Sequence, residues 1–206
     1  MSVLLQINSV ANWGSTGRIA EDIGEIAIIK GWDSYIAYGR SATTSESQLI
    51  KIGDGLDVLF HLVITRLFDM HGLGSRLATK RLVKRIDKLR PDIIHLHNIH
   101  GYYINYPILF DYLKESGIPV VWTLHDCWPF TGHCSYFSFN NCREWKVHCK
   151  HCKYISGYPA SFFIDNSKNN FDLKRRYFSS LNSLTLVPVS DWLGDLLSES
   201  FFGKIP

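Results

Sequence analysis

Short apolar runs of strand length alternate with segments of helical periodicity along most of the 206-residue chain. The predicted strands lie at residues 3–7, 34–38, 49–52, 93–97, 118–124 and 184–189. Apolar residues at helical spacing predict helices over residues 19–27, 56–70, 76–90, 107–115, 168–181 and 191–200. Strands that alternate with helices require right-handed crossovers. The pattern therefore predicts an α/β fold with a mostly parallel sheet that is covered by helices on both faces.

Composition narrows the class of protein further. With 206 residues, 46% of them hydrophobic, the chain is long enough to bury one sizeable core, so we expect a single domain over residues 1–206. Its 22 basic and 19 acidic residues are too evenly balanced for nucleic acid to be the main partner. The amino terminus lacks a basic leader, and no segment reaches the roughly 18 apolar residues of a membrane span, which predicts a cytoplasmic protein.

Ligands of such sheets bind beyond the carboxyl ends of the strands, and three loops are expected to converge there: residues 12–18, 98–103 and 125–131. The first contains Gly14 and Gly17 and leads into a helix, an arrangement that suits an anion at the helix start. The simpler alternative, that these glycines serve only a tight turn, has the greater weight. The loop lacks the G-x-G-x-x-G fingerprint, which argues against a nucleotide-dependent oxidoreductase.

His125 and Asp126 follow directly after the predicted strand 118–124, at the mouth of the expected crevice. An imidazole there can hydrogen-bond a hydroxyl or a phosphate, and an adjacent carboxylate can bind sugar hydroxyls or orient another group. For an isolated His-Asp pair, the alternative that both side chains only satisfy the loop backbone would carry more weight.

All five cysteines lie between residues 127 and 152. Four of them, ending in a C-x2-C pair, supply the thiolates of a closed tetrahedral site and predict a structural zinc held by Cys134, Cys142, Cys149 and Cys152. Such a metal would staple a Cys-rich insertion over residues 127–160. Three alternatives stay open: an iron–sulfur cluster, free buried thiols, or replacement of one thiol by His133, His148 or His151. Cys127 is assigned to neither site.

The predicted helix 76–90 is strongly basic and carries a narrow apolar stripe. Basic amphipathic helices dock on anionic lipid head groups, so the helix is a candidate for peripheral membrane contact. A solvated helix face on a globular domain is the simpler interpretation and has slightly more weight.

The order of these motifs resembles a known family of enzymes. The Gly-rich first loop, the run Pro-Asp-Ile-Ile-His-Leu-His, and above all Trp-Thr-Leu-His-Asp-Cys-Trp-Pro-Phe-Thr-Gly-His-Cys with the later cysteines are similar to the amino-terminal half of bacterial family 4 glycosyltransferases of the colanic-acid and capsular polysaccharide type. The closing Val-Pro-Val-Ser-Asp-Trp-Leu also resembles their last amino-terminal strand and helix. The resemblance covers nearly the whole chain.

This resemblance implies one Rossmann-like, doubly wound half of a GT-B enzyme that transfers a sugar from a nucleotide-sugar donor, with retention of configuration, to a saccharide or lipid-linked acceptor. In the family the amino-terminal half mainly binds the acceptor. The resemblance places His125 and Asp126 at the transferred sugar, and Gly14, Gly17 and Arg18 near the donor phosphates. Substrate contacts are expected from His97 and from stacking by Tyr102, Tyr103 and Trp128.

The sequence departs from the family pattern at its end. The chain stops at Pro206, where the second Rossmann-like half of such an enzyme would begin. We therefore expect the carboxyl-terminal donor-binding domain to be absent and the chain to be inactive alone. An alternative function is a zinc-stapled binding or scaffold module without catalysis.

Overall fold

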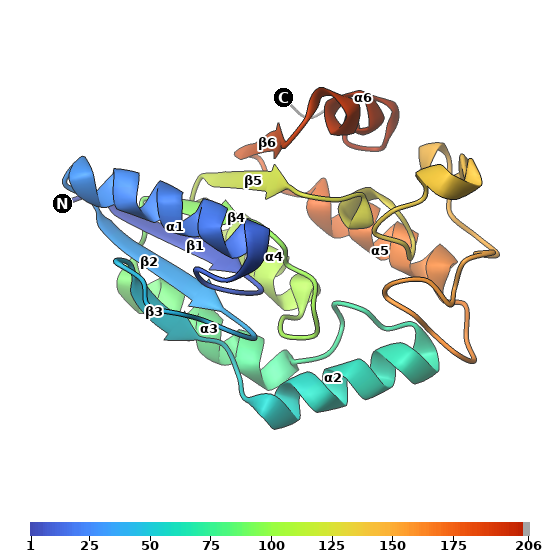
Figure 1. Cartoon of the computed structure of the whole chain (residues 1–206), viewed down its shortest axis with the longest axis horizontal. Coiled ribbons are helices and arrows are strands. Elements are labelled where there is room, and N and C mark those ends of the chain that lie inside the picture. The colour runs from blue at the N-terminus through green and yellow to red at the C-terminus, as the bar shows by residue number, and fades with distance from the viewer. Residues whose placement is uncertain (204–206) are drawn as a thin grey trace.

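The computed structural model describes residues 1–203 and contains one six-stranded sheet (Figure 1). Every pair of neighbouring strands is parallel, and the spatial order is β3-β2-β1-β4-β5-β6. The strands are β1 (Val3–Asn8), β2 (Asp33–Tyr38), β3 (Gln48–Lys51), β4 (Ile93–Leu96), β5 (Val120–Leu124) and β6 (Leu184–Pro188). The direction of winding reverses between β1 and β4, so the expected ligand crevice opens beyond the carboxyl ends of these two strands.

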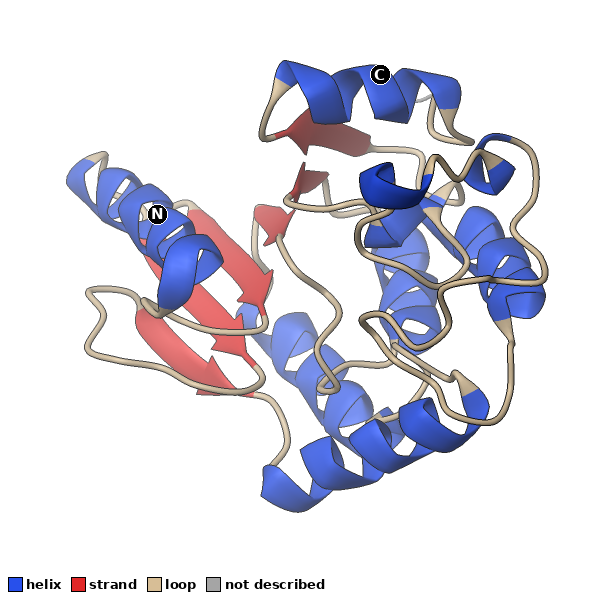
Figure 2. Ribbon diagram, turned by 45° about the vertical axis from the view of Figure 1, so that its right-hand side comes forward, coloured by secondary structure: helices blue, strands red, loops and turns tan. Residues whose placement is uncertain are grey.

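Residues 1–203 form six α-helices: α1 (Gly14–Ile29), α2 (Gly55–Phe68), α3 (Arg76–Leu89), α4 (Tyr106–Ser116), α5 (Ser167–Phe178) and α6 (Asp191–Glu199). Figures 1 and 2 show α1 and α6 on one side of the sheet and α3, α4 and α5 on the other. Sequence patterning therefore predicted the α/β class, the parallel sheet and its two helical layers correctly.

The strands consist of apolar residues because helices and loops cover both faces of the sheet. Leu5, Ile7, Ile94, Leu96 and Trp122 are almost fully buried and belong to one continuous core. A parallel strand buried on both faces needs apolar residues at successive positions, which explains the short apolar runs in the sequence. Each strand then leads into a loop on the side toward which the arrowheads point (Figure 2).

Helix α2 turns its polar side toward the protein. Its buried residues are His61 and Thr65, and the ring of His61 accepts hydrogen bonds from the backbone N–H groups of Gly72 and Gly74. The apolar residues that define its helical periodicity are mostly exposed: Leu56, Leu59, Phe60, Val63 and Phe68. The periodicity predicted the helix correctly, but its apolar face covers no part of the sheet.

The predicted glycine loop is shorter than expected, because α1 already begins at Gly14. The loop itself spans only residues 9–13, and Gly17 and Arg18 lie within the first turns of the helix. Gly17 packs closely on the loop, since a Cβ at this position would lie 3.1 Å from Cγ2 of Val10 and 3.2 Å from the amide nitrogen of Asn12. Its small size is required for packing between the helix and the loop.

The Cys-rich segment between β5 and α5 has little regular structure. Three 3-10 turns, η1 (Trp128–Phe130), η2 (Ser138–Asn140) and η3 (Glu144–Lys146), interrupt an otherwise irregular course. Its aromatic side chains form a small core, in which Trp145 stacks on Phe137 and packs against Phe130. None of the helices in residues 1–203 has the length and apolar character that crossing a membrane requires.

Candidate active site

Two histidines meet at the carboxyl edge of the sheet, one after β4 and one after β5. Nδ1 of His97 and Nε2 of His125 are 3.2 Å apart. Nε2 of His97 also lies 3.0 Å from Oε1 of Gln6 on β1. His97 is buried, whereas His125 is partly exposed. The site thus extends from buried Gln6 and His97 to His125, a side chain that solvent can reach.

A second contact joins the loops that follow the same two strands. His100 Nε2 donates to Oδ2 of Asp126 at 2.8 Å, and Nδ1 of His100 lies 3.3 Å from the hydroxyl of Tyr158. The other carboxylate oxygen of Asp126 accepts the N–H of Trp128 at 2.9 Å. Burial opposes ionisation of Asp126, but His100 and the backbone hydrogen bond outweigh it and lower its pKa. Asp126 is therefore a fixed carboxylate beside His125.

Burial favours the neutral form of His95, His97 and His125. Burial lowers the pKa of His95 to about 4 and that of His97 well below its ordinary value. Burial also lowers the pKa of His125, while Asp126 acts in the opposite direction. A neutral imidazole carries one N–H and one lone pair, so each ring both donates and accepts a hydrogen bond.

The start of α1 presents backbone N–H groups near this edge of the sheet. No side chain caps the helix, and its first turn contains no acidic residue. Gly14 has a positive φ of 61° and no atom within 4 Å of the place where a Cβ would stand. Arg18 is exposed. An uncapped helix start with a nearby arginine favours an anion electrostatically.

The aromatic residues predicted to stack on sugars are largely closed to a ligand. Trp128 is 0% exposed, Tyr103 is 1% exposed and Tyr102 is 6% exposed. The Tyr103 hydroxyl donates to the backbone carbonyl of Asn98 at 2.7 Å, which makes it part of the loop framework. As the structure places these rings, they offer a ligand little surface, and the stacking stays a prediction. The ring of Tyr158, whose hydroxyl contacts His100, is 44% exposed and accessible to a ligand.

A buried lysine supports the loop after β5. Lys174 on α5 donates to the backbone carbonyls of Trp128 at 2.8 Å and Thr131 at 3.0 Å. Its Nζ also lies 3.7 Å from the centroid of the Trp128 ring, within the range of a cation–π interaction. Burial lowers the pKa of Lys174 to about 7. The lysine fixes the turn next to Asp126 to a helix of the core.

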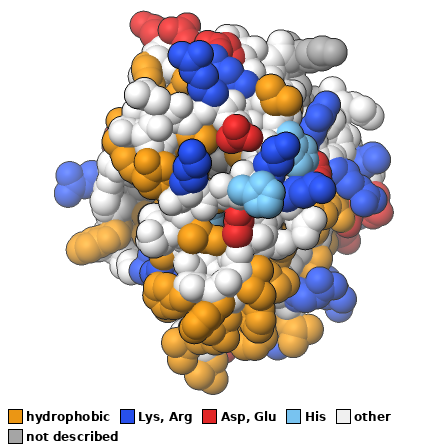
Figure 3. All heavy atoms as spheres, turned by 90° about the vertical axis from the view of Figure 1, so that its right-hand side faces the viewer, with side chains coloured by type: hydrophobic (Ala, Val, Ile, Leu, Met, Phe, Trp, Pro, Cys, Tyr) orange, Lys and Arg blue, Asp and Glu red, His pale blue; other side chains and the backbone are white. Residues whose placement is uncertain are grey.

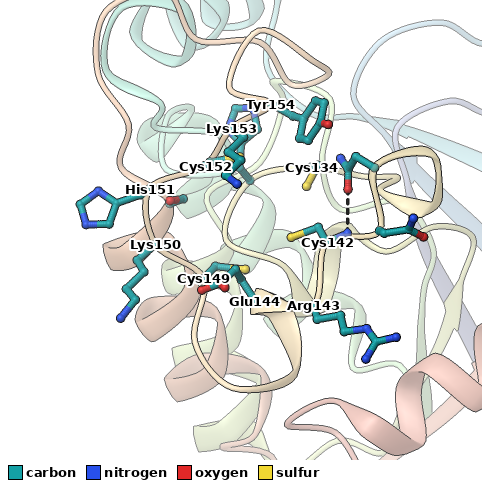
Figure 4. Close-up of a pocket in the computed structure, with 14 residues that line it drawn as sticks. Cys134, Cys142, Arg143, Glu144, Cys149, Lys150, His151, Cys152, Lys153 and Tyr154 are labelled. Atoms are coloured by element: carbon teal, nitrogen blue, oxygen red, sulfur yellow. Dashed lines mark hydrogen bonds between the residues drawn. The ribbon is translucent and has the colours of Figure 1, made fainter.

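The four cysteines of the predicted zinc site do line one cavity, of about 590 Å³ (Figure 4). Its wall includes Cys134, Cys142, Cys149 and Cys152, together with His133 and His151. All five cysteines of the chain are free. Burial raises the pKa of Cys149 to about 12, and a hydrogen bond with Cys134 raises the pKa of Cys152. Cys149 and Cys152 are thus protonated thiols at neutral pH.

The structure gives the zinc prediction no support. Within residues 1–203, no three side chains of His, Cys, Asp or Glu are arranged so that they could hold one metal ion. Two histidines that were alternative ligands have other partners: His133 pairs with Asp69, and His148 pairs with Asp172. The cysteine-rich segment shares the core of the sheet through Phe137, Trp145 and Cys149, and Tyr158 at its far end contacts His100.

Sequence reasoning missed several residues that shape the site. Gln6 and His95 lie within strands and are buried next to His97, and Tyr158 is far from the crevice in sequence. The sequence could have indicated Gln6, because it is the single polar residue inside the apolar run of β1. A buried amide needs hydrogen-bond partners, and His95 and His97 on the neighbouring strand were the candidates.

Comparison with known proteins identifies the family. The model of Glycosyltransferase Family 4 matches residues 30–163, which is more than half of the chain. The sequence is also 26% identical over 193 residues to a protein of Escherichia coli (strain K12) named as the colanic acid biosynthesis glycosyl transferase WcaC. That match covers 88% of this chain and 46% of the relative, so the chain spans about half of the relative's length. The protein therefore belongs to glycosyltransferase family 4.

Proposed function

We propose that this chain forms the acceptor-binding half of a retaining glycosyltransferase, which transfers a hexose from a nucleotide-sugar donor during surface polysaccharide biosynthesis. The observation that carries the proposal is the position of His125 and Asp126. Both follow β5 at the carboxyl edge of the sheet, beside the point where the winding reverses. Membership of glycosyltransferase family 4 supports the class of reaction.

Transfer breaks the bond between the anomeric carbon of the donor sugar and its diphosphate, and forms a bond from that carbon to an acceptor hydroxyl oxygen. The hydroxyl proton must leave as the new bond forms. In the proposal, His125 and Asp126 bind hydroxyls of the sugar or acceptor, because a neutral imidazole and a carboxylate both accept hydrogen bonds. The uncapped start of α1, with Gly14, Gly17 and Arg18, faces the negative charge of the diphosphate.

The remaining donor contacts come, in this proposal, from a second Rossmann-like half. The match to the E. coli relative covers only 46% of that protein, which is compatible with a two-domain enzyme of which this chain forms one domain. A half-site that contacts the donor only at its diphosphate cannot position the donor sugar for transfer. We therefore expect residues 1–206 without a second half to bind acceptor but not to catalyse transfer.

Peripheral contact with a membrane is the second part of the proposal. The exposed apolar residues of α2 are continued by Phe162, Phe163 and Ile164, and we call this set the outer apolar face. The two parts are joined, since the N–H of Phe162 donates to the carbonyl of Arg66 on α2 at 2.8 Å. Figure 3 shows hydrophobic side chains gathered at the lower end of the molecule, the level at which α2 lies in Figure 1.

Charge favours an anionic lipid surface as the occupant of this face. The neighbouring helix α3 exposes six basic residues: Arg76, Lys80, Arg81, Lys84, Arg85 and Lys88. A large apolar patch beside basic side chains is typical of proteins that lie on anionic bilayers. A protein lying on the membrane in this way could reach the head group of a lipid-linked acceptor.

The proposed function is tested by binding to the isolated chain. Saturation-transfer NMR with candidate oligosaccharides, and with nucleotide sugars as the comparison, measures each ligand class separately. We expect saccharides to bind and to perturb the signals of His125 and His100, while nucleotide sugars bind weakly. Tight nucleotide-sugar binding with no saccharide binding would contradict the assignment to the acceptor side. The alternative of a zinc-stapled module has no comparable support within residues 1–203.

A further inference from the structure

A line of three polar side chains runs from the core to the crevice. Gln6 on β1 contacts His97 after β4, and His97 contacts His125 after β5, at 3.0 and 3.2 Å. Gln6 is 0% exposed and His97 is 1% exposed. Buried polar groups of this kind have few alternative partners, so the direction of each hydrogen bond can be worked out from the inner end outward.

The orientation of the Gln6 amide is fixed by its other contact. Its Nε2 lies 2.6 Å from the carbonyl oxygen of Ala20 and must donate to it, because the carbonyl has no proton. Oε1 is therefore the atom that faces His97. An amide oxygen only accepts, so Nε2 of His97 must carry a proton and donate it to Gln6.

His97 then has no second proton to give. Burial, together with His95 and His125, keeps its pKa well below the ordinary value, so the ring is neutral at pH 7. His95 stacks on His97 with ring centroids 4.3 Å apart. Positive charge on both rings would therefore be unfavourable. With its proton on Nε2, His97 offers a lone pair at Nδ1. It therefore accepts a hydrogen bond from Nε2–H of His125.

We propose that Gln6 and His97 are positioning residues that hold His125 in the tautomer with its proton on Nε2, leaving the Nδ1 lone pair to accept a hydrogen bond from a saccharide hydroxyl. Nδ1 of His125 has no hydrogen-bond partner within the described residues. A lone pair there attracts a hydroxyl and repels a phosphate oxygen. The inference rests on the proposed function, and it assigns the ligand class of His125 as a sugar or acceptor hydroxyl.

The tautomer can be measured without any transfer reaction. Long-range ¹⁵N–¹H correlation spectra of the labelled chain distinguish protonated from unprotonated ring nitrogens, and a His125→Gln variant assigns the signals. We expect a protonated Nε2 and an unprotonated Nδ1 in His125 at pH 7.5. A protonated Nδ1, or a rapidly exchanging mixture of both tautomers, would overturn the inference.

Substitution of Gln6 tests the direction of the relay. In Gln6→Glu, the carboxylate favours the doubly protonated form of His97, which then donates from Nδ1 and forces the His125 proton onto Nδ1. In Gln6→Met no acceptor remains, and the two tautomers of His125 should mix. The matched control Gln48→Glu makes the same change at an exposed position on β3 and should leave His125 unaltered. An unchanged His125 in a folded Gln6→Glu or Gln6→Met chain would contradict the relay.

Kinetics in the complete enzyme separate this inference from the proposed function. Gln6→Met should lower kcat by at least about tenfold with little change in the KM for the donor, because the substitution misplaces a hydrogen-bond acceptor at the reacting sugar. Normal kcat with a scrambled tautomer would overturn the positioning role. Absence of transfer by the unsubstituted enzyme, with the tautomer as described, would instead count against the proposed function.

Discussion

Nδ1 of His133 donates to Oδ1 of Asp69 at 2.7 Å, and both side chains are 0% exposed. The contact joins the Cys-rich segment to the carboxyl end of α2, 64 residues earlier in the chain. Nε2 of His133 faces a second acceptor, the carbonyl oxygen of Gly157, at 3.3 Å. Burial alone would lower the pKa of His133, but the hydrogen bond and charge of Asp69 outweigh it and raise the pKa. In its doubly protonated form, the ring donates to both acceptors.

Removing the charge of Asp69 should destabilise the fold in a pH-dependent way. A histidine pKa raised by folding stabilises the protein below the unfolded pKa, and this contribution is lost as the pH rises through the raised value. We expect Asp69→Asn to reduce the free energy of unfolding by about 3–5 kcal/mol at pH 6, and by less at pH 9. Urea denaturation at both values measures the difference, and a penalty independent of pH would contradict this role.

The chain contains its own control for that experiment. His148 and Asp172 form a pair of nearly the same length, 2.8 Å, but their side chains are 29% and 53% exposed. Solvent screens such a pair, so Asp172→Asn should cost less than about 1 kcal/mol. The contrast between two His–Asp pairs of nearly equal length isolates the effect of burial.

Gly39 leaves no room for a side chain, because the Tyr103 ring lies directly against its backbone. A Cβ at this position would overlap Cβ and two ring carbons of Tyr103. We expect Gly39→Ala to lower the free energy of unfolding by about 1–3 kcal/mol through overpacking. Gly55→Ala is the control, since no atom lies within 4 Å of the place where its Cβ would stand, and it should stabilise α2 by about 0.5–1 kcal/mol. Equal melting temperatures of the two variants would be inconsistent with this packing.

The acid side of the activity profile should report the protonation of His125. Burial lowers its pKa, so transfer by the complete enzyme is expected to decline only below about pH 6.5, the ordinary value of an imidazole. The charged or titratable groups near it are His95, His97, His100 and Asp126. Asp126 raises the His125 pKa, and Asp126→Asn should therefore shift the acid limb to lower pH. A shift to higher pH would have the wrong sign.

Binding to lipid vesicles tests the outer apolar face. Sedimentation with phosphatidylglycerol vesicles should retain the protein, and Phe60→Asp combined with Phe163→Asp should weaken binding by at least about tenfold. Ile29→Asp changes an equally exposed apolar residue on α1 and should have no effect. Added salt should weaken the contribution of α3. Unchanged binding by the double variant would contradict membrane contact through the outer apolar face.

The strands of the sheet were predictable because the sequence pattern that marks each one lies within a few consecutive residues. Buried parallel strands appear as short apolar runs, and each of the six was visible in the sequence at nearly its observed position. The meeting of His97 and His125 was also predictable, since His97 ends one of these runs and His125 follows another. Their contact follows from the rule that the carboxyl ends of neighbouring parallel strands meet at one edge.

Side-chain burial outside the regular elements was not predictable in the same way. Trp128 and Tyr103 stand in loops at the crevice mouth, where the sequence indicates ligand contact, yet they fill space beneath the loops. Helix α2 faces outward, with His61 turned inward to bind backbone N–H groups of the turn that follows the helix, a contact that periodicity does not reveal. In both cases the deciding contact lies outside the periodic pattern of a single helix or strand.

The most direct test of the account is the transfer rate of the complete enzyme after His125→Ala. His148→Ala, which alters a surface histidine remote from β5 in the chain, serves as the folded control. With a labelled nucleotide sugar and a saccharide acceptor, we expect His125→Ala to lower kcat/KM by about 100-fold or more, with unaltered thermal stability, and His148→Ala to remain near the unsubstituted rate. Equal rates for both variants would contradict the placement of the sugar at His125.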